Sequence, residues 1–119
     1  QLKQALLNLM LNAVQAMATA KPERGDSKEL IIRTSGEVDQ GRPVIVVHVI
    51  DTGPGIDAEV IPRVFTPYFT TKSGGTGLGL PTTRRLIEAH HGRIDVHTEL
   101  GKGTDFVVTL PALEREGEG

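Results

Sequence analysis

Apolar positions in the first 18 residues follow the period of an α-helix. Between residues 2 and 18 they recur every three or four positions, at Leu2, Leu6, Leu9, Ala13 and Ala16. That spacing places them on one side of a helix and polar residues on the other. We therefore expect an amphipathic helix over 2–18.

Two shorter apolar runs have the length and composition of strands. Residues 30–34 form the first, and residues 44–50 (VIVVHVI) form the second, which reads as the more buried. The turn-forming sequence Gly41-Arg42-Pro43 between them predicts a hairpin. Asp51 to Gly55 then breaks the second strand.

The second half of the chain alternates helical and strand patterns. Asp57 can cap a short helix that runs to about Val64. A longer helix is expected over 81–91, with Gly92 as its C-terminal cap. Strands are expected over 93–98 and 105–110, joined by a tight turn at 101–103. This order predicts an α+β fold, a two-layer α/β sandwich.

Composition narrows the class of protein. The chain has 119 residues and a net charge of −2, with no basic stripe that would favour nucleic-acid binding. It has no cysteine, which excludes disulfides and thiolate metal sites and fits a reducing compartment. No apolar run approaches the ~18 residues of a membrane span, and no signal peptide is visible. We expect one cytoplasmic domain over 1–113 and a polar tail over 114–119.

The segment 65–80, FTPYFTTKSGGTGLGL, carries the strongest chemical signal. Its glycines allow several backbone N–H groups to point at one anion, and a helix beginning near Pro81 adds its positive end. It matches neither the dinucleotide pattern, because Leu80 takes the last glycine position, nor a Walker A loop. A flexible linker is the alternative reading. We interpret the segment as a cradle for the triphosphate of ATP.

Two asparagines in the first helix are candidate metal ligands. Asn8 and Asn12 are four residues apart and so share one helical face. They could be ordinary surface amides. An amide oxygen is also a hard, neutral ligand that suits a magnesium ion which keeps water and phosphate oxygens as its other ligands.

The sequence DTGPGID, residues 51–57, follows the apolar strand directly. Asp, Gly and Pro build strand-ending turns in any case. A carboxylate at the end of a buried strand needs a donor, however, and an exocyclic amine of a base would supply one. Gly53 and Gly55 would let the backbone lie against a flat ring.

Together these segments resemble the ATP-binding catalytic domain of bacterial sensor histidine kinases, in the superfamily shared with gyrase, Hsp90 and MutL. NLMLNAVQA resembles the N box, DTGPGID the G1 box, FTPYF the F box and GTGLGL the G2 box, with GKGTDF as a later glycine turn. The TTK before the glycines is most similar to the nitrogen-regulatory type. The resemblance implies a Bergerat-type fold, with a mixed sheet covered on one face by about three helices.

The resemblance also implies roles for individual residues. Asn12 would coordinate Mg²⁺, with Asn8 as a second polar contact. Asp51 would read the adenine amine with support from Thr104, and Gly53 and Gly55 would border the base.

For the segment over the phosphates, the resemblance implies a lid. Phe65 and Phe69 would anchor and hinge it, and Lys72 would approach the terminal phosphates as the catalytic residue. The phosphate chain would be held by the backbone N–H groups of Gly75, Thr76, Gly77, Leu78, Gly79 and Leu80.

The chain departs from the family pattern in four places. Gln15 stands where many relatives have a basic residue, Tyr68 replaces a phenylalanine, and His91 takes a position usually held by glycine. The strand that normally precedes the asparagine helix does not appear.

The function implied is transfer of the γ-phosphate of Mg-ATP to a histidine on a separate dimerisation domain of a two-component sensor kinase. None of the four histidines is followed by Asp or Glu, so we interpret them as structural or surface residues. The isolated chain should bind ATP without autophosphorylating. Its partners would be the dimerisation domain and a response regulator, with no nucleic acid and no membrane contact.

Three other functions are alternatives to histidine phosphorylation. Hydrolysis of the gyrase kind is disfavoured because Asn8 stands where those relatives have a glutamate base. An anti-sigma-type serine kinase and a non-catalytic nucleotide-binding regulatory module stay open.

Overall fold

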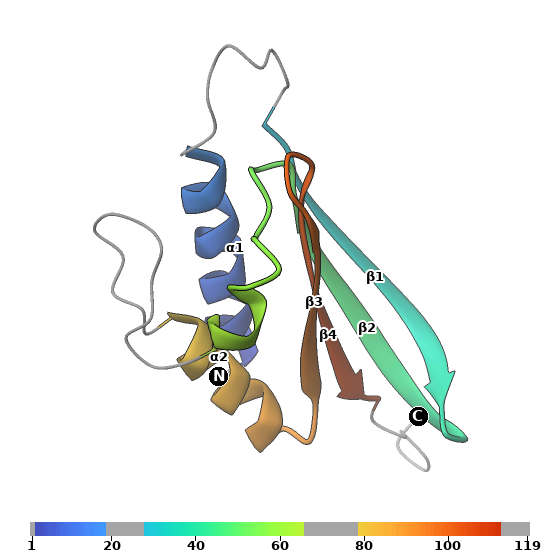
Figure 1. Ribbon diagram of the computed structural model, residues 1–119. Coiled ribbons are helices and arrows are strands. Elements are labelled where there is room, and N and C mark those ends of the chain that lie inside the picture. Colours follow the sequence, from blue (N-terminus) through green and yellow to red (C-terminus); the bar gives the residue numbers. More distant parts are fainter. Residues whose placement is uncertain (1, 19–27, 66–78, 113–119) are drawn as a thin grey trace.

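A four-stranded antiparallel sheet carries the helices on one face in the computed structural model, which describes residues 2–18, 28–65 and 79–112 (Figure 1). The sheet order is β1-β2-β4-β3. The strands are β1 (Leu30–Asp39), β2 (Arg42–Asp51), β3 (Arg93–Glu99) and β4 (Gly103–Pro111). The helices are α1 (Leu2–Ala18), α2 (Gly79–Ala89) and the short 3-10 helix η2 (Ile61–Arg63).

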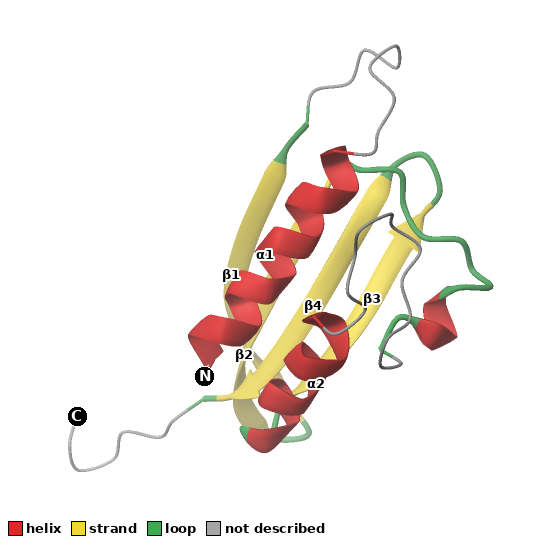
Figure 2. Cartoon of the chain, turned by 90° about the vertical axis from the view of Figure 1, so that its left-hand side faces the viewer, coloured by secondary structure: helices red, strands yellow, loops and turns green. Residues whose placement is uncertain are grey.

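The two α-helices lie side by side on the sheet (Figure 2), which confirms the two-layer α+β fold. Two details differ from the expectation of a mixed sheet under three helices. Every pairing among the described strands is antiparallel, and the third helical element is a single 3-10 turn. Neither described α-helix is both long and apolar enough to cross a bilayer.

The core lies between the helices and the two central strands. Alternation along β2 turns Val47 and Val49 toward the helices, and their register partners Val108 and Phe106 in β4 face the same way. Ala5 and Leu9 of α1, one helical turn apart, and Ile87 of α2 complete the buried cluster. The helix over 2–18 is therefore confirmed, although its buried positions are Ala5, Leu9, Ala13 and Met17, and the predicted Leu2, Leu6 and Ala16 are only half-buried.

β1 and β2 form the predicted hairpin with a two-residue turn. Asp39 pairs with Arg42, and the residues between them, Gln40 and Gly41, have φ of 54° and 80°. Positive φ at both positions is the type I′ geometry that matches the twist of the strands. β1 continues to Asp39, five residues beyond the predicted end, because its polar second half pairs with β2 at an edge with little helix cover.

The end of α2 corrects the predicted cap. His91, and not Gly92, takes the left-handed conformation, with φ of 64°. The Gly92 N–H donates to Ile87 O at 3.0 Å and the His91 N–H to Glu88 O at 2.9 Å. These are the two hydrogen bonds of a Schellman motif. Gly92 is needed for space, since a Cβ there would lie 2.6 Å from Thr109 O.

Between β2 and α2 the predicted short helix is mostly a turn. The Asp57 side chain accepts the Glu59 N–H at 2.9 Å, as expected of a cap, and the Val60 N–H donates to Asp57 O at 2.8 Å. Only Ile61–Arg63 then forms a 3-10 helix. Pro62 stands inside it and cannot donate a backbone hydrogen bond, so the segment does not extend into a full α-helix.

Candidate functional site

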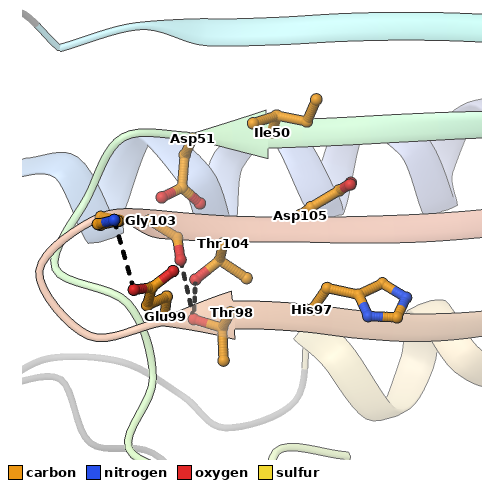
Figure 3. A pocket seen from close by; sticks show the side chains of 9 residues that line it. Ile50, Asp51, His97, Thr98, Glu99, Gly103, Thr104 and Asp105 are labelled. Atoms are coloured by element: carbon orange, nitrogen blue, oxygen red, sulfur yellow. Dashed lines mark hydrogen bonds and ion pairs between the residues drawn. The ribbon is translucent and has the colours of Figure 1, made fainter.

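A buried carboxylate lies where β2 ends beside α1. Asp51 is 2% exposed and is the register partner of Thr104 in β4. The Gly53 N–H donates to its Oδ1 at 2.8 Å, which holds the carboxylate toward the helix layer. Figure 3 shows Asp51, Thr98 and Thr104 close together at the strand ends. The sequence therefore predicted correctly that this aspartate ends a buried strand.

The loop after Asp51 is fixed to the β3–β4 turn by two backbone contacts. The Gly101 N–H donates to Pro54 O at 2.8 Å, and the Ile56 N–H donates to Thr98 Oγ1 at 2.9 Å. Gly55 lies between them with φ of 81°, and a Cβ there would collide with the backbone of Glu99. The described contacts of Gly55 are thus with the β3–β4 turn, whereas we predicted that it borders a base.

Gly53 lies against α1 instead. A Cβ there would sit 3.0 Å from Asp51 Oδ1 and 3.3 Å from the backbone of Ala16. A side chain at this position would therefore press on both the carboxylate and the helix.

Asn8, Asn12 and Ala16 form one row along α1, because they are spaced four residues apart. Ala16 touches the loop at Gly53, so Asn12 and Asn8 lie about 6 and 12 Å further along the helix at 1.5 Å per residue. Both asparagines are half-buried, and the Gln4 side-chain amide donates to Asn8 Oδ1 at 2.9 Å. A ligand held at Asp51 and extended along α1 would reach both amides. Gln15 is exposed.

The described residues hold no cluster of three or more His, Cys, Asp or Glu side chains that could bind a metal ion. A cation near α1 would therefore take its ligands from asparagine amides, water and the oxygens of a bound anion. Such an oxygen set suits magnesium.

Phe65 and Leu80, on either side of the glycine-rich segment, both pack against the core. The Phe65 ring meets Phe106 edge-on, with centroids 6.4 Å apart and planes at 81°. The Arg84 guanidinium lies 5.5 Å from the centroid of Phe65, a cation–π contact that the sequence did not reveal. Gly79 begins α2. The other predicted residues of this segment lie outside the described residues: Phe69, Lys72, Gly75, Thr76, Gly77 and Leu78.

Thr98 is a polar residue of the site that sequence reasoning missed. It is the register partner of Thr104, and their hydroxyl oxygens are 2.9 Å apart. The signal in the sequence is the alternation of side chains along a strand, because Thr98 continues the inward-facing series of Ile94 and Val96 along β3. A hydroxyl at an inward position needs hydrogen-bond partners.

A hollow of about 310 Å³ lies at the same end of the sheet (Figure 3). Its lining includes outward-facing residues that alternate with Asp51, Thr98 and Thr104, namely Ile50, His97, Glu99 and Asp105. No residue of α1 lines it. Asp51, Thr98 and Thr104 also line the hollow, so it adjoins the buried carboxylate. On the outer face of the sheet His48 Nδ1 lies 2.9 Å from Asp105 Oδ2.

Comparison with known proteins gives consistent matches. The family model described as "Histidine kinase-, DNA gyrase B-, and HSP90-like ATPase" matches residues 1–114. Sensor histidine kinase ZraS of Salmonella typhimurium is 39% identical over 116 residues, which is 98% of this chain and 23% of the relative. Sensor protein FixL of Bradyrhizobium diazoefficiens is 40% identical over 114 residues, 96% of this chain and 21% of the relative. The chain thus spans about a quarter or less of the length of these relatives.

Solved structures agree. Full-length ShkA in complex with AMPPNP superposes with a TM-score of 0.75 at 33% identity, covering 92% of this chain and 21% of that one. The nucleotide-free catalytic domain of histidine kinase ThkA gives a TM-score of 0.70 at 34% identity, covering 92% of this chain and 64% of that one.

Proposed function

Because the chain belongs to the histidine kinase-, DNA gyrase B- and HSP90-like ATPase family and its relatives are sensor histidine kinases, we propose that it binds Mg-ATP and donates the γ-phosphate to a histidine on a separate dimerisation domain. The observation that carries the proposal is the buried Asp51 carboxylate beside the row of α1 amides. A ligand bound there would meet a base-reading acceptor at Asp51 and neutral oxygen ligands further along α1.

Adenine recognition is assigned to Asp51 and Thr104. Asp51 is 2% exposed and Thr104 is 6% exposed, so a base that reaches them leaves water. In such a setting a hydrogen bond to a carboxylate contributes about 1.5–3 kcal/mol. Gly53 leaves the room that this contact needs beside α1.

Phosphate and metal binding are assigned to the asparagine row and the glycine-rich segment. Asn12 would hold Mg²⁺, with Asn8 as a second contact, and the ion would neutralise charge on the phosphates. Lys72 and the N–H groups of 75–80 would hold the phosphate chain. Phosphoryl transfer requires little beyond such positioning and charge neutralisation.

The phosphate acceptor is assigned to another domain. Within the described residues His48 pairs with Asp105 on the outer face, and His90 Nδ1 bonds Leu86 O at 2.9 Å. His91 lies two residues beyond the end of α2, and His97 lies on the outward-facing side of β3. The partner would be the dimerisation domain of the full-length kinase, followed by a response regulator, in the cytoplasm.

Nucleotide selectivity tests the proposal. Isothermal titration with Mg-ATP and Mg-GTP should show binding of ATP at least about tenfold tighter, since guanine presents an oxygen where adenine presents the amine. Asp51→Asn should remove most of that preference. Asp105→Asn is the matched control, because this carboxylate lies on the opposite face and should leave selectivity unchanged. Equal affinities for ATP and GTP in the unaltered chain would contradict the proposal.

The acceptor is tested by phosphotransfer. The chain is mixed with candidate dimerisation domains and γ-labelled ATP, and the expected product is acid-labile phosphate on the added domain. Acid-stable label on serine would support the serine-kinase function instead, and binding without transfer to any partner would support a nucleotide-binding regulatory module.

A further inference from the structure

Thr98 forms hydrogen bonds with three residues of the site, one in the loop after Asp51 and two in β4. Its hydroxyl accepts the Ile56 N–H, donates to Gly103 O and lies against the Thr104 hydroxyl, each at 2.9 Å. We propose that Thr98 is a positioning residue for adenine selectivity, which acts by fixing the direction of the Thr104 O–H. The proposal deepens the proposed function and rests on it.

The number of hydroxyl protons fixes the direction of each of these hydrogen bonds. A threonine hydroxyl has one proton to donate and two lone pairs to accept with. A carbonyl can only accept, so the Thr98 proton goes to Gly103 O. The contact between the two hydroxyls therefore requires Thr104 to be the donor and Thr98 the acceptor. The Ile56 N–H takes the remaining lone pair, which leaves Thr98 fully used.

The Thr104 hydroxyl therefore has a fixed hydrogen-bond direction. Its proton is committed to Thr98, so toward any other neighbour it can only accept. Thr104 pairs in register with Asp51, whose carboxylate also acts as an acceptor, as toward the Gly53 N–H. Two adjacent acceptors favour a ligand edge that donates, such as the adenine amine, and disfavour the carbonyl oxygen of hypoxanthine or guanine.

Loss of the Thr98 hydroxyl would release this arrangement. In Thr98→Val the Thr104 proton becomes free to turn toward the ligand and donate to a carbonyl oxygen. The Ile56 N–H would also lose its partner, although the Gly101 to Pro54 bond still holds the loop. Discrimination between bases should therefore fall more than overall affinity.

The test compares Mg-ATP with Mg-ITP, whose bases differ at the group on C6, on the 119-residue chain. The unaltered chain should favour ATP by at least about tenfold, the worth of one hydrogen bond. Thr98→Val should lower that ratio at least threefold, and Thr98→Ser, which keeps the hydroxyl, should restore it. Val96→Ala is the matched control, because it weakens packing on the same strand and face without touching the hydroxyl.

Two results would overturn the inference. The first is a parallel loss of affinity for both nucleotides in Thr98→Val and Val96→Ala, with the ratio unchanged, which is what a purely structural role predicts. The second comes from Thr104→Val, which removes the acceptor directly and gives an answer even where Thr98→Val does not fold. An unchanged ratio in that variant contradicts the mechanism.

A double variant tests whether Thr98 affects selectivity through Thr104. If Thr98 acts through Thr104, adding Thr98→Val to Thr104→Val should change the ratio no further. If the folded, unaltered chain binds neither nucleotide, the proposed function itself fails and this inference fails with it. That outcome differs from binding without discrimination, which removes only the selectivity argument.

Discussion

Replacing His91 by glycine should stabilise the domain. His91 lies two residues beyond the end of α2 with φ of 64°, a conformation that costs an L-residue about 1–2 kcal/mol and glycine none of this. Glycine loses more backbone entropy on folding, about 0.5–1 kcal/mol, which offsets part of this gain. The net expected gain is about 0.5–1 kcal/mol, or a rise in Tm of about 2–6 °C for a domain of this size.

The measurement is thermal unfolding by calorimetry, supported by urea titration. His91→Ala removes the exposed imidazole and keeps the Cβ, so it should give no gain. Gly92→Ala should destabilise, because its Cβ would lie 2.6 Å from Thr109 O and 2.7 Å from Leu110 Cδ2. If His91→Gly proved no more stable than His91→Ala, backbone strain at this residue would be the wrong explanation.

Three further predictions concern the loop after Asp51, the Phe65 ring and the β1–β2 turn. Gly55→Ala should weaken Mg-ATP binding at least tenfold in calorimetry, because the added Cβ collides with Glu99 and lifts the loop from the β3–β4 turn. Unchanged affinity would show that this packing does not matter for binding. Phe65→Ala should lower the free energy of unfolding in urea by about 2–3 kcal/mol through loss of the contact with Phe106, and Phe65→Leu should lose less; equal losses would count against the ring contact. Gln40→Asn should raise the free energy of unfolding by about 0.5 kcal/mol, since asparagine tolerates positive φ in a type I′ turn better than glutamine does. A loss of stability would argue against that turn.

The helices and strands that could be predicted are those whose apolar residues recur with a clear period along the chain. Residues 2–18 were assigned correctly because the buried positions Ala5, Leu9 and Ala13 recur once per turn. β1 was predicted too short because its second half faces solvent and carries no apolar alternation. The left-handed position of His91 was not predicted, because glycine is the usual signal for it and a glycine stands next to it.

The candidate site, like the fold, could be predicted only in part. Asp51 could be located because it directly follows an apolar strand. Alternation along β3 places Thr98 on the inward face, but its role could not be predicted, because its partner Ile56 lies 42 residues away and only the folded sheet brings them together. Gly55 was predicted to border the base, and its described contacts are with the β3–β4 turn, which depend on tertiary packing.

The proposed function requires that Mg-ATP binds along α1, with the base at Asp51 and the metal at Asn12. The most direct measurement is a titration of the folded chain with Mg-ATP to saturation, in which the amide chemical shifts are recorded by NMR. We expect large changes at the Gly53 amide and the Asn12 side chain, and small ones at Val107 on the outer face. A folded chain whose spectrum stays unchanged at saturation, or changes only on the outer face, would contradict the proposed function.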